Sequence, residues 1–166
     1  MVKNYKKEST KREGVLSEAI GGRRHVGSGA FWFKKGDASN EFIFIEDKFT
    51  NAPSYSLSVD TLYRLDKQAA KEEKIPVFTL GFASKESFAF VKDNYIVEYG
   101  DVDITEEFVC KKKSITLKYD ALYKSFINSS ESVWGKLILE KYNETYFILS
   151  WDCFVDIYKR LLGVSS

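Results

Sequence analysis

The chain has 166 residues, which is enough for one domain with a hydrophobic core and short for two. Its 25 Lys and Arg residues balance 24 Asp and Glu residues, and 44% of its residues are hydrophobic and 16% aromatic. This composition excludes a disordered chain, and no apolar stretch approaches the roughly 20 residues that a membrane-spanning helix needs. The near-zero net charge says nothing about a polyanionic partner, so we expect a globular protein whose chemistry lies in local motifs.

The first predicted element is a short amphipathic helix over residues 10–20. Thr10 and Glu13 have the spacing of a capping box, and a pair of glycines at 21–22 provides a C-terminal stop. Seven basic residues against three acidic ones within residues 1–24 suit phosphate contacts, although a solvated terminus has the same composition. The Gly-Ser-Gly sequence at 27–29 then predicts a turn built from small residues.

A turn at 35–37 leads into a predicted strand over residues 41–48. Ser58 is placed to cap a following helix that runs to about Lys74. A buried strand is expected at 75–83, with Pro76 at its start. Helix and strand signals thus alternate, which predicts an α/β domain with a mixed central sheet flanked by helices.

Two segments of the chain resemble each other at an offset of sixty residues. "SYSLSVDTLYRL" from Ser54 matches "SITLKYDALYKS" from Ser114, and residues 77–79 then fall opposite 137–139. With a one-residue slip, residues 92–99 fall opposite 151–158. The pattern predicts an internal duplication of a module of about 45 residues, so that 92–166 resembles 54–99. The competing interpretation is that both segments use the same strand-to-helix signals.

The cysteines favour a reducing compartment. Cys110 and Cys153 stand alone, in neither a CxxC spacing nor a run with histidine, so neither a zinc site nor a disulfide framework is indicated. The N-terminus is charged and has no apolar segment after it of the kind found in a signal peptide. We therefore expect a cytoplasmic protein.

Candidate chemistry lies in "SNEFIFIEDKFT" at 39–50, a strongly apolar run that ends in three charges. Because side chains alternate along a strand, Glu46 and Lys48 should share one face while Asp47 points away. A hairpin at the preceding turn would bring Asp37 to the same end of the sheet. Two carboxylates suit Mg²⁺, which takes one or two protein carboxylates together with phosphate oxygens, and Lys48 can stabilise charge on a phosphate. The pattern predicts metal-assisted hydrolysis of a phosphodiester.

These residues carry a resemblance to a known family. "KGD" at 35–37 and "IEDK" at 45–48, preceded by "GGRRHVGSGA" and followed by "IPVFTLGF", resemble the PD-(D/E)xK nucleases, and more narrowly the archaeal and phage Holliday-junction resolvases of the Hjc type. The resemblance covers residues 10–83 well and the end of the chain more loosely. It implies a restriction-endonuclease-like fold in a single nuclease domain, 1–166, with a catalytic core at 10–91 and a C-terminal extension at 92–166.

The resemblance also implies the roles of particular residues. The catalytic set carried over is Glu13, Asp37, Glu46 and Lys48, with the metal, Mg²⁺ or Mn²⁺ in its place, on Asp37 and Glu46. The DNA-binding residues implied are Arg23, Arg24, Ser28 and Lys35. The substrate would be branched DNA, above all a four-way junction, cut by a homodimer that has two active sites, in the host cytoplasm if a phage encodes the protein.

Several alternatives stay open at this point. Glu18 lies on the same predicted helix as Glu13 and could replace it, and Glu13 and Ser28 are also explained by a capping box and a turn. In the second copy, Val109 and Lys111 stand where Glu and Lys would be, which predicts an inert site. The rival functions are another PD-(D/E)xK nuclease, for repair, restriction or flap cutting, and a nonenzymatic DNA-binding protein on a nuclease scaffold.

Overall fold

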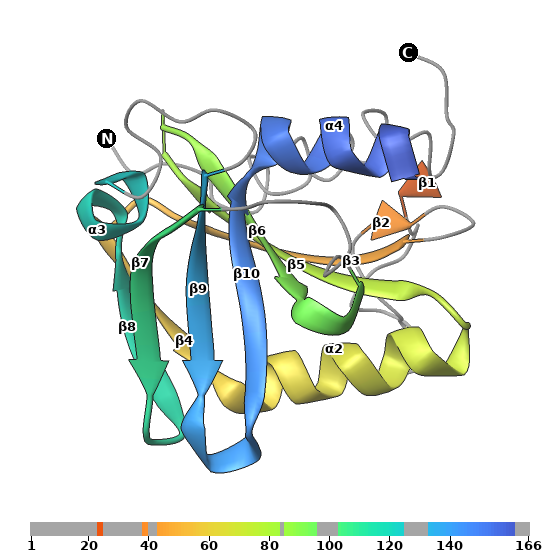
Figure 1. Cartoon of the computed structure of the whole chain (residues 1–166), viewed down its shortest axis with the longest axis horizontal. Helices are drawn as coiled ribbons and strands as arrows, with labels where there is room; N and C mark the ends of the chain where they lie inside the picture. The colour runs from red at the N-terminus through yellow and green to blue at the C-terminus, as the bar shows by residue number, and fades with distance from the viewer. Residues whose placement is uncertain are drawn as a thin grey trace.

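The computed structural model describes residues 23–24, 38–39, 43–83, 85–95, 103–124 and 133–161. Over these residues the chain forms an eight-stranded mixed sheet, a two-stranded sheet and three α-helices (Figure 1). The predicted fold class, a mixed central sheet flanked by helices, is confirmed. None of the described helices is long and apolar enough to cross a bilayer.

The strands of the large sheet are, in spatial order, β1 (Arg23–Arg24), β2 (Ala38–Ser39), β3 (Ile43–Thr50), β5 (Ile75–Phe82), β6 (Ser87–Lys92), β10 (Glu144–Ser150), β9 (Val133–Leu139) and β7 (Asp103–Cys110). The small sheet pairs β4 (Ser54–Ser58) with β8 (Ser114–Lys118). The helices are α2 (Val59–Lys71), α3 (Tyr119–Lys124) and α4 (Trp151–Leu161), and two 3₁₀ turns are η1 (Asp93–Tyr95) and η3 (Glu140–Tyr142).

Helix α2 begins directly after Ser58, as predicted, but the Ser58 side chain forms no capping hydrogen bond. The apolar stripe of the helix, Val59, Leu62, Leu65 and Ala69, is buried. It ends at Lys71 rather than near Lys74. Glu73 adopts a left-handed φ of 57°, and the Lys74 N–H donates to the Ala69 carbonyl at 2.9 Å. This is the hydrogen bond of a Schellman turn, which stops the helix and directs the chain into β5.

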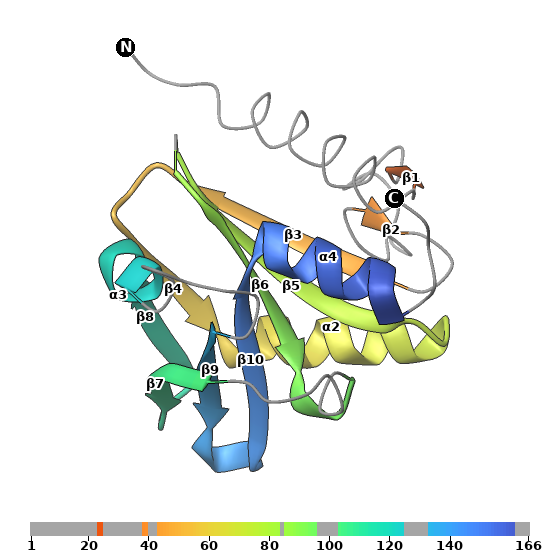
Figure 2. The ribbon, with the colours of Figure 1, turned by 45° about the horizontal axis from the view of Figure 1, so that its top comes forward.

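Two hydrophobic cores cover the two faces of the large sheet. Phe44 of β3 and Phe78 of β5 belong to the core between the large sheet and the layer formed by α2 and the small sheet. On the other face of the large sheet, Ile43 and Ile45 pack with Ile157 of α4. Helices α2 and α4 accordingly lie on opposite sides of the sheet, with α4 across its middle (Figure 2). The even-numbered residues of β3 therefore face the α2 side.

The strand order is two-fold symmetric about the middle of the sheet. Strands β3 and β5 are parallel and β5 and β6 antiparallel; on the other side β7 and β9 are parallel and β9 and β10 antiparallel. Strands β6 and β10 meet antiparallel at the centre, where Phe90 pairs with Ile148. In spatial order, β3, β5 and β6 thus form one three-strand arrangement, and β7, β9 and β10 form a second copy of it.

The small sheet has the same symmetry. Ser56 pairs with Thr116, sixty residues later, at the middle of the β4–β8 ladder. The Val59 N–H donates to the Lys113 carbonyl, and sixty residues on the Tyr119 N–H donates to the Pro53 carbonyl, both at 2.9 Å. These reciprocal hydrogen bonds relate β3, β4 and α2 to β7, β8 and α3 by a two-fold axis within the chain.

The offset of sixty does not extend to the next strand. Glu46 pairs with Phe78, and Glu106, sixty residues later, pairs with Gly135, so Phe78 corresponds to Gly135 at an offset of 57. The predicted match of 77–79 with 137–139 is therefore wrong. Val77 packs in the core under α4 and Leu137 in the core on the α2 side. A match between Val77 and Leu137 would therefore place equivalent residues on opposite faces of the large sheet.

Candidate active site

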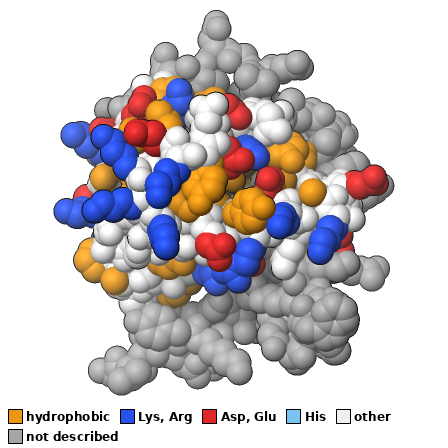
Figure 3. All heavy atoms as spheres, turned by 90° about the horizontal axis from the view of Figure 1, so that it is seen from below, with side chains coloured by type: hydrophobic (Ala, Val, Ile, Leu, Met, Phe, Trp, Pro, Cys, Tyr) orange, Lys and Arg blue, Asp and Glu red, His pale blue; other side chains and the backbone are white. Residues whose placement is uncertain are grey.

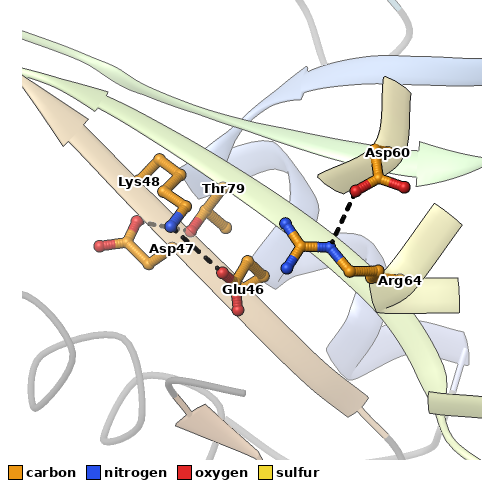
Figure 4. A network of polar contacts seen from close by, with 6 residues as sticks. All are labelled: Glu46, Asp47, Lys48, Asp60, Arg64 and Thr79. Atoms are coloured by element: carbon orange, nitrogen blue, oxygen red, sulfur yellow. Dashed lines mark hydrogen bonds and ion pairs between the residues drawn. The ribbon is translucent and has the colours of Figure 1, made fainter. Parts of the chain in front are cut away.

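Strand β3 presents Glu46 and Lys48 on one face, as strand alternation predicts. The Lys48 Nζ lies 3.3 Å from the Glu46 Oε1 (Figure 4). The Lys48 side chain is 41% exposed and that of Glu46 is 23% exposed, so the pair is anchored in the sheet and still open to a ligand from solvent. Exposed ion pairs contribute little stability, which leaves this one without a structural need for its position.

Asp47 points to the opposite face and is only 4% exposed. The Thr79 hydroxyl, directly across on β5, donates to the Asp47 Oδ1 at 2.6 Å (Figure 4). Burying a carboxylate costs free energy unless the carboxylate accepts hydrogen bonds. The short hydrogen bond from Thr79 meets this need and links β3 to β5 beside Glu46 and Lys48. Asp47 thus holds the strand that carries Glu46 and Lys48, and sequence reasoning did not identify Thr79 as its partner.

Tyr55, from β4, lies close enough to the pair to interact with both charges. Burial raises the pKa of the Tyr55 hydroxyl, the Lys48 ammonium lowers it and the Glu46 carboxylate raises it, with a net increase. The ring lies 6.5 Å from that of Phe78 in the core. Tyr55 is therefore a neutral hydroxyl beside the site at neutral pH, and the sequence offered no signal for it beyond its place in the repeated segment.

Several predicted site residues lie outside the described residues. These are Glu13, its alternative Glu18, Ser28, Lys35 and Asp37. The residue that follows Asp37, Ala38, pairs through its backbone with Ile45, the residue that precedes Glu46. Strand β1, which holds Arg23 and Arg24, pairs with β2 and so belongs to the same end of the sheet order, although the placement of these two side chains is not described.

The described residues provide a limited donor set for a metal. They contain no group of three or more His, Cys, Asp or Glu residues that could hold an ion. Asp47 accepts a hydrogen bond in the interior, so the solvent-accessible carboxylate at this point of β3 is that of Glu46. Mg²⁺ keeps several waters and needs only one or two protein carboxylates, so Glu46 fits such an ion as one of its ligands.

The second half of the chain has a related position with different residues. By the offset of sixty between β3 and β7, Glu106 corresponds to Glu46 and Phe108 to Lys48. The predicted equivalents, Val109 and Lys111, are wrong, because the repeat places residues 103–110 opposite 43–50. Phe108 packs against the core and carries no charge, so the second position lacks the ammonium.

Comparisons with known proteins find similarity among solved structures. No model of a known protein family and no curated protein sequence matches this chain. Among solved structures it is similar to Hjc, a Holliday junction resolvase from the archaeal hyperthermophile Archaeoglobus fulgidus. The two are 20% identical, the match covers 69% of this chain and 87% of that chain, and the TM-score is 0.46. The function is therefore inferred from the site residues themselves.

Proposed function

We propose that this chain is a metal-dependent DNA endonuclease of the PD-(D/E)xK type that hydrolyses phosphodiester bonds in branched DNA, with the four-way junction as its substrate. The observation that carries the proposal is the Glu46–Lys48 pair. A carboxylate and an ammonium lie 3.3 Å apart on one open face of a buried strand, where strand stability requires neither. Asp37 precedes the strand that pairs with β3 and is the second carboxylate of the proposed site.

The chain's residues divide the work of phosphodiester hydrolysis. Glu46 would hold Mg²⁺ together with Asp37, and the bound ion would supply a more acidic water and a polarised phosphoryl group. The Lys48 side chain is 41% exposed, so its ammonium can approach a non-bridging phosphate oxygen and stabilise the negative charge that develops during attack. The Thr79–Asp47 hydrogen bond on the opposite face fixes the strand, so the two functional side chains need little reorganisation.

The internal two-fold axis bears on the assembly. It relates the Glu46–Lys48 pair to Glu106 and Phe108, so one chain contains one complete pair among its described residues. Cutting both strands of a symmetric junction requires two active sites. We infer that paired cleavage needs a homodimer and that the second half of each chain acts without chemistry of its own.

A second candidate function is DNA binding without cleavage. The internal two-fold axis favours this candidate, because the second half of the chain has the same strand arrangement without the lysine of the charged pair. Against it, the Glu46 carboxylate remains beside Lys48 in the first half, where it would repel the DNA phosphates that a surface used only for binding must contact.

The test uses four-way, flap and linear DNA built from the same strands, each incubated with Mg²⁺ or with EDTA. We expect Mg²⁺-dependent cleavage of the four-way junction. Equal cleavage of linear duplex would indicate another nuclease of this type instead. Binding of all three without cleavage would overturn the enzymatic proposal in favour of the second candidate.

A further inference from the structure

A cavity of about 710 Å³ opens at the start of α2, away from Glu46 and Lys48 in the sequence and lined by other residues. Its walls are Ser58, Val59, Asp60, Tyr63, Lys113 and Tyr142. They come from the end of β4 and the start of α2, from the turn between β7 and β8, and from η3. The cavity therefore lies where the two halves of the chain meet, and its size is in the range of sites that bind small organic ligands.

Two tyrosine side chains give the cavity its character. Tyr63 is 51% exposed and Tyr142 55% exposed, which makes them the most exposed large hydrophobic residues in the described part of the chain. The Lys67 Nζ lies 4.7 Å from the centre of the Tyr63 ring and restricts its position. Exposed aromatic rings beside a hollow are typical of surfaces on which nucleobases stack.

The charges around the cavity favour an anionic ligand. Lys113 lines it, and the exposed Lys111 and Lys112 precede Lys113 in the same turn. The acidic member of the lining, Asp60, is paired with Arg64 at 3.3 Å, which offsets its charge (Figure 4). On the face that carries α2 and the β9–β10 connection, hydrophobic side chains lie among Lys and Arg side chains, with Asp and Glu side chains between them (Figure 3).

We propose that this cavity binds an unpaired nucleotide of single-stranded DNA, with its base stacked on Tyr63 and Tyr142 and a phosphate near Lys113. The choice of DNA as the ligand rests on the proposed function, but the binding itself requires neither the metal nor Lys48. Flaps, gaps and other single-stranded segments of branched DNA expose unpaired bases, whereas an intact four-way junction is fully paired. Stacking tolerates any base because every base has an aromatic face. The cavity would therefore hold a branched substrate by a single-stranded segment while the duplex arms are bound elsewhere.

The two-fold axis supplies a matched control. Tyr123, sixty residues after Tyr63, is also on a helix and 41% exposed, but its ring stacks on Tyr119 at 5.6 Å and does not line the cavity. Replacing Tyr63 and replacing Tyr123 by alanine remove the same side chain from equivalent positions. Only the first change should affect binding.

The experiment measures fluorescence anisotropy of labelled oligothymidylate and of an abasic strand of equal length, both in EDTA. Tyr63→Ala and Tyr142→Ala should each weaken oligothymidylate binding about tenfold or more, with abasic binding unchanged. Tyr123→Ala should bind both strands like wild type, and Tyr63→Phe should retain binding because the ring remains. Equal losses for the two strands, or no loss, would overturn the proposal, and thermal unfolding verifies that the variants fold.

The result can be separated from the fate of the proposed function. Tyrosine-dependent binding of oligothymidylate by a chain that cuts no DNA would support the cavity and refute the enzyme. If the four-way junction is cut with Mg²⁺ but the tyrosine variants bind oligothymidylate like wild type, the enzyme is supported and the nucleotide-binding cavity is refuted.

Discussion

Lys48 and Glu46 lie with Nζ and Oε1 3.3 Å apart on one face of β3, while Asp47 between them is buried on the other. The three consecutive charged residues within β3 thus have two different functions. The outer two form the candidate active site, and the middle one connects β3 to β5 through Thr79.

The first prediction concerns catalysis. Glu46→Gln and Lys48→Ala should each reduce Mg²⁺-dependent cleavage of a four-way junction by about 100-fold or more, because a metal ligand or a charge-stabilising group is lost. Both variants should still bind the junction in EDTA. The matched control is Glu106→Gln, the equivalent change in the second half, which should cut like wild type. Unchanged cleavage by both Glu46→Gln and Lys48→Ala would refute the site.

The second prediction concerns the buried hydrogen bond. Thr79→Val keeps the shape of the side chain and removes the hydroxyl that donates to Asp47 at 2.6 Å. Because the acceptor is a buried carboxylate, we expect the free energy of unfolding to fall by about 1–3 kcal/mol. Urea unfolding measures this difference. Thr79→Ser keeps the donor and should lose less stability; if it loses as much as Thr79→Val, packing of the methyl group explains the effect instead.

The third prediction concerns the end of α2. Glu73 has a φ of 57°, a conformation that costs a residue with a Cβ about 1 kcal/mol and costs glycine almost nothing. Glu73→Gly should therefore raise the free energy of unfolding by about 0.5–1 kcal/mol. Glu73→Ala removes the same charge and keeps the strain, so it should be nearly neutral. A similar gain in both variants would show that the charge, rather than the backbone, is the cause.

The fourth prediction concerns Lys92, which joins α2 to the central strands. Its Nζ lies 3.3 Å from Asp66 and 3.1 Å from Glu144. Burial lowers the pKa of Lys92, but the hydrogen bonds and charges of Glu144 and Asp66 outweigh it and raise that pKa above the ordinary 10.5. A raised pKa in the folded state adds stability that is complete below 10.5 and is lost as the pH rises through the folded value.

Lys92→Met should accordingly lower the free energy of unfolding by about 1–2 kcal/mol at neutral pH, since it leaves two partly buried carboxylates without their cation. The difference between wild type and variant should shrink above pH 10.5. Urea unfolding at a series of pH values measures it. A difference that stays constant across that range would show that packing of the lysine side chain, and not its charge, accounts for the loss.

Local patterns in the sequence determined much of this protein. The two-residue period of β3 predicts which of its charged residues share a face, and the spacing of Leu62, Leu65 and Ala69 after Ser58 predicts α2. The resemblance between residues 54–65 and 114–125 corresponds to a symmetric pair of strands, since Ser56 of β4 pairs with Thr116 of β8, sixty residues later. Each of these features depends on residues close together in the chain, so a single sequence displays it.

Only the tertiary structure decided which distant residues meet. Thr79 is the partner of Asp47 because of the register between β3 and β5. Tyr55 lies beside the charged pair because the small sheet packs against the α2 side of the large one. Register is set by hydrogen bonds between backbones far apart in the sequence, and a shift of one residue exchanges the faces of a strand. The periodicity of a segment states that it has two faces, but which partner lies across from each residue is determined when the sheet assembles.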